Sequence, residues 1–351
     1  MACLLKKIYL KFLTISKVIG LFKLSKILTS KKLRILCYHN FTSDNNLLSW
    51  MPSLHITPET LKKRINYITK SDYSILGLND AVRLLKANKG IPDLPIVITI
   101  DDGWSSILRL AHPIFHNARV KYTVYLTSWY YKNNFPLFNL VVQFVLWSAY
   151  KNGFELKNIP LPFKVDDNVY NNHKDLSKEI INYCSKELSI NDRYTLLRNI
   201  CNQVMFDYDS LEKNKSLSLV DKCELEILIK DGVDIQLHTH THKWPLDEIT
   251  AEAELSKNRL YIESATNSSA DHLCYPSGIW HESQFKYLDK NNIKSATTCE
   301  AGLNCQSTNK YLLHRFLDAD NIPQIVFEAN MSGFIYIMEK INIFKITKRL
   351  F

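Results

Sequence analysis

The chain has 351 residues, 46% hydrophobic and 23% charged, which is long enough for a sizeable core and too apolar for a disordered protein. Its formal charge is +9, but residues 1–34 hold nine basic residues and no acid, while the rest balances 35 basic against 35 acidic residues. This uneven distribution argues against a nucleic-acid partner and favours contact of the N-terminus with a membrane surface.

Residues 1–32 predict a basic amphipathic helix. Lysines interrupt its apolar residues, so it lacks both the uninterrupted core of roughly 7–15 residues of a signal peptide and the about 20 apolar residues of a membrane span. Two interpretations stay open, an interfacial helix on the inner membrane and a helix packed on the protein's own core. The C-terminal segment 331–351 is similarly apolar and basic, with Lys340, Lys345, Lys348 and Arg349.

The body of the chain, 33–330, alternates strand and helix patterns, which predicts parallel pairing in an α/β fold. We expect strands at 33–38, 73–76, 95–100, 121–126, 233–237, 273–275, 294–298 and 311–316. Expected helices are 58–70, 78–88, 105–117, 249–264 and 282–291. Residues 135–215 interrupt this alternation and predict a helical insertion, after which 218–221 resemble a capping box for a helix ending before Gly232.

Eight cysteines are scattered through apolar segments without a Cys-x-x-Cys pair. This usage predicts buried free thiols in a reducing compartment. Together with the lack of an export signal, it predicts a cytoplasmic protein, peripheral on the inner membrane if the N-terminal helix binds lipid.

Two carboxylates follow the buried strand 95–100, in the triplet Asp101-Asp102-Gly103. Neighbours on a strand point to opposite faces, so these side chains converge only where the strand ends, and Gly103 permits the turn. One carboxylate would bind a metal while the other takes a proton, and the pattern alone leaves open which does which. A plain turn is the alternative interpretation.

A second polar cluster, His238-Thr239-His240-Thr241-His242, follows the strand 233–237. On an extended strand, residues four apart lie roughly 13 Å from each other, too far for one ion. If the chain turns after His238, His242 returns to the same side and both imidazoles reach one centre. One Asp and two His leave a coordination position open for water or substrate, as in catalytic zinc sites. The alternative is an adventitious metal binder.

These motifs resemble those of the polysaccharide deacetylase family, carbohydrate esterase family 4, which removes N- or O-acetyl groups from sugar polymers. Residues 99–103 resemble the family's Thr-Phe-Asp-Asp-Gly, 238–242 its His-Ser/Thr-x-x-His, 274–278 its Tyr-Pro-Tyr-Gly, and 312–316 its Leu-Pro-Arg-Ile. The resemblance implies a distorted (β/α)₇ barrel, interrupted here by the insertion. It also implies one divalent metal at the mouth, zinc in the first place and cobalt or nickel as alternatives.

By the same resemblance, Asp102, His238 and His242 are the metal ligands and Asp101 is the catalytic base. The family's larger branch pairs this base with an arginine of the third motif, which is missing here, and we expect Arg315 to replace it. The pair Tyr38-His39 is similar to a branch that carries its general acid early in the chain. His39 is therefore the expected acid. His314 is the alternative, and His39 would then be an ordinary histidine at a strand end.

The implied activity is removal of N-acetyl groups from N-acetylhexosamine residues of a bacterial surface glycan or its lipid-linked precursor. Tyr275, Trp280 and Trp104 are the candidates for contact with the carbohydrate, since aromatic faces suit pyranose rings, although each could equally fill the core. Two alternatives remain, a catalytically inactive glycan-binding barrel and a membrane-associated scaffold of a polysaccharide assembly complex.

Overall fold

A parallel sheet forms the centre of the computed structural model, which describes residues 2–87, 89–133 and 135–341. Its strands are β1 (Arg34–Tyr38), β4 (Ser74–Ile75), β5 (Pro95–Ile100), β6 (Thr123–Leu126), β7 (Asp234–Leu237), β8 (His272–Cys274), β9 (Ser295–Thr297) and β10 (Phe316–Leu317). Seven follow one another in the order β10-β1-β5-β6-β7-β8-β9, and β4 pairs with the beginning of β5. Both faces of β5 are covered, because all six of its residues are buried.

The sheet curls until its first and last strands in the chain meet. β1 pairs in parallel with β10. Just before β10, the N–H of Leu313 donates to the carbonyl of Ala296 at 3.0 Å, and the N–H of Thr298 donates to the carbonyl of Leu313 at 2.9 Å. The segment from Leu313 to β10 thus joins β9 to β1, which confirms the predicted distorted barrel. The predicted bounds of the last strand, 311–316, are wrong, because only a single bridge forms at Leu313.

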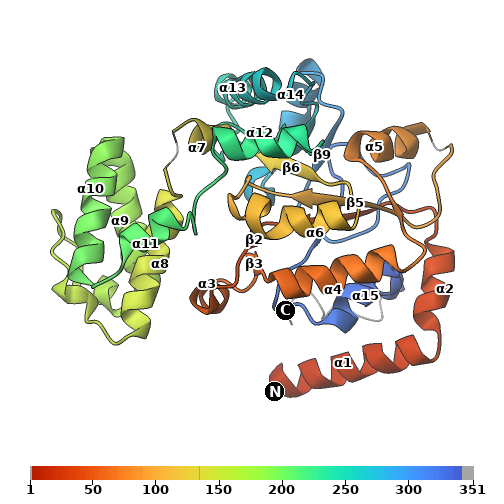
Figure 1. Cartoon of the computed structure of the whole chain (residues 1–351), viewed down its shortest axis with the longest axis horizontal. Coiled ribbons are helices and arrows are strands. Elements are labelled where there is room, and N and C mark those ends of the chain that lie inside the picture. The colour runs from red at the N-terminus through yellow and green to blue at the C-terminus, as the bar shows by residue number, and fades with distance from the viewer. Residues whose placement is uncertain (1, 88, 134, 342–351) are drawn as a thin grey trace.

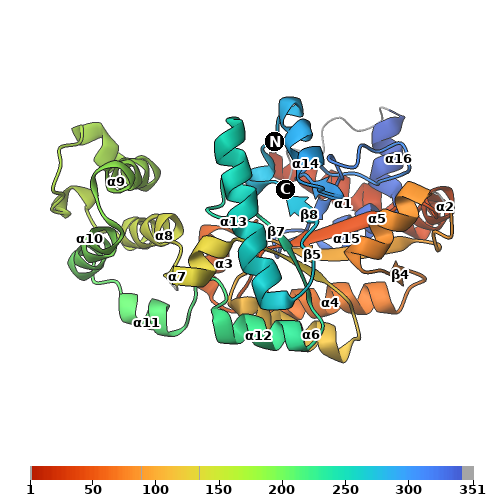
Figure 2. The ribbon, with the colours of Figure 1, turned by 90° about the horizontal axis from the view of Figure 1, so that it is seen from above.

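Helices surround this sheet (Figures 1 and 2). They are α4 (Pro58–Thr69), α5 (Leu78–Ala87), α6 (His112–Asn117), α12 (Lys222–Lys230), α13 (Glu248–Thr266) and α14 (Phe285–Lys290). A smaller parallel pair, β2 (Asn40–Phe41) and β3 (His55–Ile56), and the helices α3 (Asn45–Trp50) and α7 (Ser128–Asn133) complete this part. The capping box of α12 joins Asp221 and Glu224, so the box predicted at 218–221 is wrong, because Asp221 is the residue that precedes the first turn.

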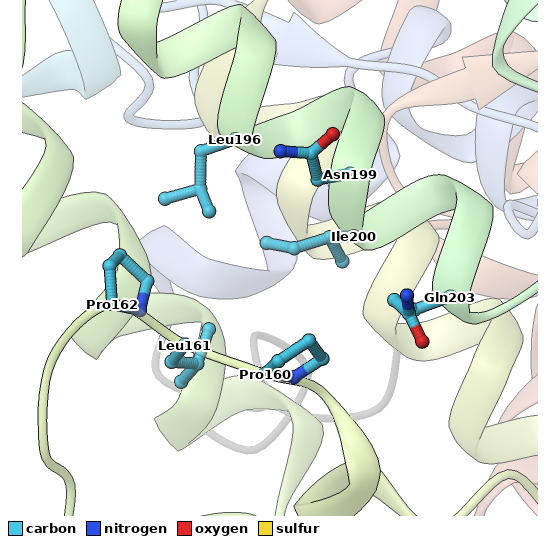
Figure 3. Close-up of a pocket in the computed structure, with 7 residues that line it drawn as sticks. All are labelled: Pro160, Leu161, Pro162, Leu196, Asn199, Ile200 and Gln203. Carbon is cyan, nitrogen blue, oxygen red and sulfur yellow. The ribbon is translucent and has the colours of Figure 1, made fainter.

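The predicted insertion contains four helices that stand apart from the barrel, on the left of Figures 1 and 2. They are α8 (Phe138–Lys151), α9 (His173–Glu187), α10 (Ile190–Gln203) and α11 (Tyr208–Lys213). Figure 3 shows a pocket of about 450 Å³ between the loop 160–162 and α10. None of its lining residues belongs to the cavity beside Asp102 and His242 described below.

Two helices, α1 (Ala2–Val18) and α2 (Leu21–Leu28), replace the single predicted N-terminal helix. The chain breaks at Gly20, whose φ of 89° lies in the left-handed region that glycine favours. One face of this pair packs on α15 (Gln324–Met331) and α16 (Phe334–Lys340), which form an apolar cluster with it. Residues of that cluster include Tyr9, Leu13, Phe22, Val326, Ala329 and Phe334.

The other face of α1 and α2 is open and apolar. Its exposed side chains are Leu4, Leu5, Ile8, Ile15, Val18, Ile19, Leu24, Ile27 and Leu28. No helix of the described chain is both long and apolar enough to cross a bilayer. Of the predicted basic C-terminal segment, residues 342–351 lie outside the described residues.

The cysteines with described side chains are all free. Cys37, Cys184, Cys201 and Cys274 are buried, as predicted, whereas Cys305 is half-buried. The prediction of buried thiols is wrong for Cys223 and Cys299, which are exposed.

Candidate metal centre and active site

A tight turn separates the two carboxylates that follow β5. Asp102 has φ 69° and Gly103 has φ 89°, so the backbone enters the left-handed region as the strand ends. A Cβ atom at Gly103 would lie only 2.4 Å from Cδ1 of Leu126, so a side chain at this position would require the Leu126 methyl group to move. The turn sends Asp101 towards the buried interior and Asp102 towards the histidines.

Three side chains converge on one point at the mouth of the barrel. Oδ1 of Asp102 lies 3.2 Å from Nε2 of His238 and 3.3 Å from Nε2 of His242. Tetrahedral ligands at about 2.1 Å from an ion lie about 3.4 Å from one another, so the three atoms fit a single zinc-type ion. His242 returns to the centre because Thr239 and His242 both have positive φ, 63° and 59°. The bend that the sequence required after His238 is therefore present.

Hydrogen bonds orient these three ligands. Nδ1 of the buried His238 lies 2.8 Å from the carbonyl of Cys274 and must donate to it, which turns Nε2 towards the centre. The indole N–H of Trp104 donates to Oδ2 of Asp102 at 2.9 Å. His240, by contrast, stacks on Tyr261 and bonds to a serine, away from this centre.

Asp101 pairs with Arg315. The guanidinium donates to Oδ1 at 2.7 Å and to Oδ2 at 2.8 Å, and the side chains of Asp101 and Arg315 are 3% and 0% exposed. Burial alone would raise the pKa of Asp101, but the charge and hydrogen bonds of Arg315 hold it well below its usual range. The carboxyl is therefore an anion, and Arg315 occupies the place expected of the missing third-motif arginine.

His39 is the histidine that lies beside Asp101. Its Nε2 is 3.7 Å from Oδ2 of Asp101, and its side chain is 20% exposed. His314 points away from Arg315 on the other face of the chain, as alternate residues of an extended segment do, and its Nδ1 lies 3.8 Å from Oε2 of Glu300. The geometry thus brings His39 and not His314 to the expected base.

Two thiols also contact Asp101, and the sequence interpretation missed them. Sγ of Cys274 lies 3.3 Å from Oδ2 of Asp101, and Sγ of Cys37 lies 3.5 Å from the same oxygen. Cys274 opens the third motif and Cys37 precedes the Tyr-His pair, so their places in the chain were a usable signal.

Burial contradicts two of the three predicted carbohydrate contacts. Trp104 and Tyr275 are each 1% exposed, so neither offers a ring face to a ligand, and these two predictions are wrong. Both rings are buried in the hydrophobic core of the protein, and Trp104 instead orients Asp102 through its indole N–H. Trp280 is half-buried and stacks on Phe285, and its role stays a prediction.

A cavity of about 740 Å³ contains Asp102 and His242. Thr127, Trp129 and Tyr130, which follow β6, also line this cavity, and residues of the insertion complete its lining. The sequence interpretation missed Trp129 and Tyr130. Their position directly after the strand next to β5 was the available signal.

Comparisons with known proteins agree with this architecture. Residues 204–296 match the family model described as polysaccharide deacetylase. No curated protein sequence matches the chain.

Three solved structures share the fold at low sequence identity. The deacetylase PplD of Streptococcus pyogenes, in complex with acetate, is 14% identical with a TM-score of 0.58, covering 86% of this chain and 99% of that one. IcaB of Ammonifex degensii is 12% identical with a TM-score of 0.53, covering 86% and 97%. BC0361, a polysaccharide deacetylase from Bacillus cereus, is 13% identical with a TM-score of 0.52, covering 86% and 69%.

Proposed function

We propose that the chain is a polysaccharide deacetylase, a metal-dependent hydrolase acting on N-acetylhexosamine residues of a bacterial surface glycan or its lipid-linked precursor, because residues 204–296 match that family model and the fold resembles solved deacetylases. The observation that carries this proposal is the joint geometry of two adjacent groups. One is the triplet Asp102, His238 and His242, whose ligand atoms fit one ion. The other is the pair of Asp101 and His39, 3.7 Å apart and bordering the same centre.

Asp102, His238 and His242 would hold the divalent ion, zinc in the first place, with cobalt or nickel as alternatives. Such an ion supplies a Lewis acid that polarises a carbonyl and lowers the pKa of water to about 7. The chain's own contribution is to fix the three ligand atoms on the same side of the barrel mouth. The bond from His238 to the carbonyl of Cys274 fixes the orientation of the ring and turns Nε2 towards the other two ligand atoms.

Asp101 and His39 divide the proton transfers. Asp101 is an anion and accepts a proton from the attacking water, while Arg315 holds both carboxylate oxygens in place. His39 donates a proton to the leaving amine, which is a poor leaving group without it. Each group therefore has a single role, and removal of either blocks a different step.

Acetate release tests this division. Protein loaded with zinc should release acetate from chitooligosaccharides, and Asp101→Asn should abolish release while retaining the metal. His39→Gln should slow release by about 10²–10⁴-fold. His314→Gln, the matched control, should stay near the wild-type rate. Loss in His314→Gln with an active His39→Gln would reverse the assignment of the acid. Metal-loaded, folded protein that releases no acetate from any N-acetylated glycan would favour the inactive glycan-binding barrel or the scaffold.

The open face of α1 and α2 supports attachment to a membrane surface as part of this proposal. Its exposed leucines and isoleucines lie among the lysines of residues 1–34, so apolar burial and attraction to anionic lipid act together. Ile27→Glu should reduce sedimentation with anionic vesicles. Leu260→Glu, an equally exposed residue on α13, should not, and equal effects of the two would contradict attachment through this face.

A further inference from the structure

The helical insertion forms one wall of the cavity that contains Asp102 and His242. Residues from α8, α9 and α10 face the barrel across it. They include Phe138, Leu140, Gln143, Ile181, Arg193 and Tyr194. These helices lie outside the segment that matches the family model.

Among the described residues that line the cavity, positively charged side chains outnumber acidic ones. Asp102 is the one acidic residue among its described lining residues, and a bound divalent ion would more than neutralise it. Two cations line the same space, Lys243 next to the metal ligand His242 and Arg193 on α10. Within the described parts of the chain, neither forms an ion pair with a carboxylate. A negative ligand group would therefore meet two cations whose charge the protein leaves uncompensated.

Arg193 is held in place for such a role. Its Nε donates to the carbonyl of Leu188 at 3.1 Å, and its Nη2 donates to the carbonyl of Ser185 at 3.2 Å. These bonds occupy part of the guanidinium and fix its position, so less side-chain freedom is lost when a ligand binds. Lys243 is exposed, and its backbone N–H donates to Oγ1 of Thr239 at 3.1 Å.

Tyr130 lines the same cavity as Arg193 and Asp102. Burial raises the pKa of the Tyr130 hydroxyl, which also feels the positive charge of Arg193 and the negative charge of Asp102. All three residues line the same cavity, together with Trp129, whose ring lies edge-on to Tyr130 at 4.8 Å. A molecule that fills this cavity would therefore lie against both Arg193 and Asp102.

We propose that Arg193 and Lys243 select an anionic glycan, in which the N-acetylhexosamine at the metal centre carries or adjoins a phosphate or a carboxylate. This inference rests on the proposed deacetylase activity and adds the charge class of its substrate. The phosphate would come from a 1-phosphate or lipid-linked sugar, and the carboxylate from a neighbouring uronic acid. Both offer negatively charged oxygens that guanidinium and ammonium groups bind.

Three substrates test the proposal: diacetylchitobiose, diacetylchitobiose 1-phosphate and a hyaluronan tetrasaccharide. Zinc-loaded wild type should deacetylate at least one anionic substrate with a kcat/KM about tenfold above that of the neutral one, the size of one charge-assisted contact. Lys243→Gln and Arg193→Gln should each raise the KM for that substrate several-fold more than the KM for diacetylchitobiose. The preferred anion identifies the source of the charge.

Two controls keep the result interpretable. Lys257→Gln removes an exposed charge of α13, outside the cavity, and should change nothing. Arg193→Lys should restore most of the selectivity if charge matters, whereas it would not if Arg193 only supports α9 and α10. Equal kcat/KM for neutral and anionic substrates, or equal effects of Lys257→Gln and Lys243→Gln, would overturn the inference while the deacetylase function stands. No acetate from any of the three substrates would count against both.

Discussion

Replacing Arg315 by methionine would leave the carboxylate of Asp101 buried without its counter-charge. The pair is connected by two hydrogen bonds of 2.7 and 2.8 Å, and the side chains of Asp101 and Arg315 are 3% and 0% exposed. Removing one partner of a buried ion pair costs roughly 3–5 kcal/mol, because the remaining charge loses its partner but stays out of water. We expect Arg315→Met to be destabilised by that amount at neutral pH.

The pH dependence of this loss has a definite sign. In the wild type, Arg315 holds the pKa of Asp101 below its unfolded value, so the group stabilises the fold at neutral pH and that contribution is lost as the pH falls through the folded-state pKa. In the variant, burial dominates and raises the pKa above the unfolded value of about 3.9. Protonation then relieves the variant's penalty. The stability difference between the two proteins should therefore shrink as the pH falls from 8 towards 5.

Urea unfolding at several pH values measures this difference. Arg198→Met is the matched control, since Arg198 pairs with Asp209 at the surface and its loss should cost at most about 1 kcal/mol. The double variant Asp101→Asn with Arg315→Met should lose less stability than the two single variants summed, because the charges depend on each other. An Arg315→Met protein within 1 kcal/mol of the wild type at every pH would refute the assignment of Arg315 as the partner of Asp101.

Three further predictions concern the turn, acid stability and the metal. Gly103→Ala should lower the free energy of unfolding by several kcal/mol and reduce zinc occupancy, because its Cβ would lie 2.4 Å from Leu126. The control is Gly153→Ala, which has φ 80° and open space around it. It should lose only the left-handed backbone cost of about 1–2 kcal/mol. Burial lowers the pKa of His272 to about 4, so between pH 6.5 and 4 the unfolded state binds more protons and the fold loses up to about 3 kcal/mol. His272→Gln should flatten this part of the urea stability curve, and parallel curves would contradict the cause. Zinc should raise the thermal midpoint of the wild type but not of His242→Gln, and equal shifts would remove His242 from the ligand set.

Buried apolar runs allowed the central strands to be predicted. β5 spans 95–100 as expected, because a continuous β-branched run is buried on both faces wherever it lies in a parallel sheet. The last strand was misplaced because its pairing with β1 is a contact between segments far apart in the chain, which local patterns do not encode. The N-terminal segment was predicted as a single helix, since an isolated glycine such as Gly20 does not by itself predict the end of a helix.

The residues of the site were likewise predictable only in part. Spacing required a bend after His238, and the structure has that bend. The aromatic predictions at Trp104 and Tyr275 are wrong because burial of a ring depends on what the rest of the chain packs over it. The cavity wall at Arg193 was not predictable from local sequence, because the insertion and the barrel meet only in three dimensions.

Closure of the barrel by β10 has a consequence for biosynthesis. β1 is made before the other described strands of the sheet, yet one of its two neighbours, β10, is made after all of them. Until then, one edge of β1 has open hydrogen-bonding groups, which chaperones or other nascent chains can engage. Arg315 directly precedes β10, so Asp101 gains its counter-charge only after this segment has been made. A nascent chain thus contains Asp102, His238 and His242 before Asp101 has its partner, and the arrangement of the site is completed only when β10 joins the sheet.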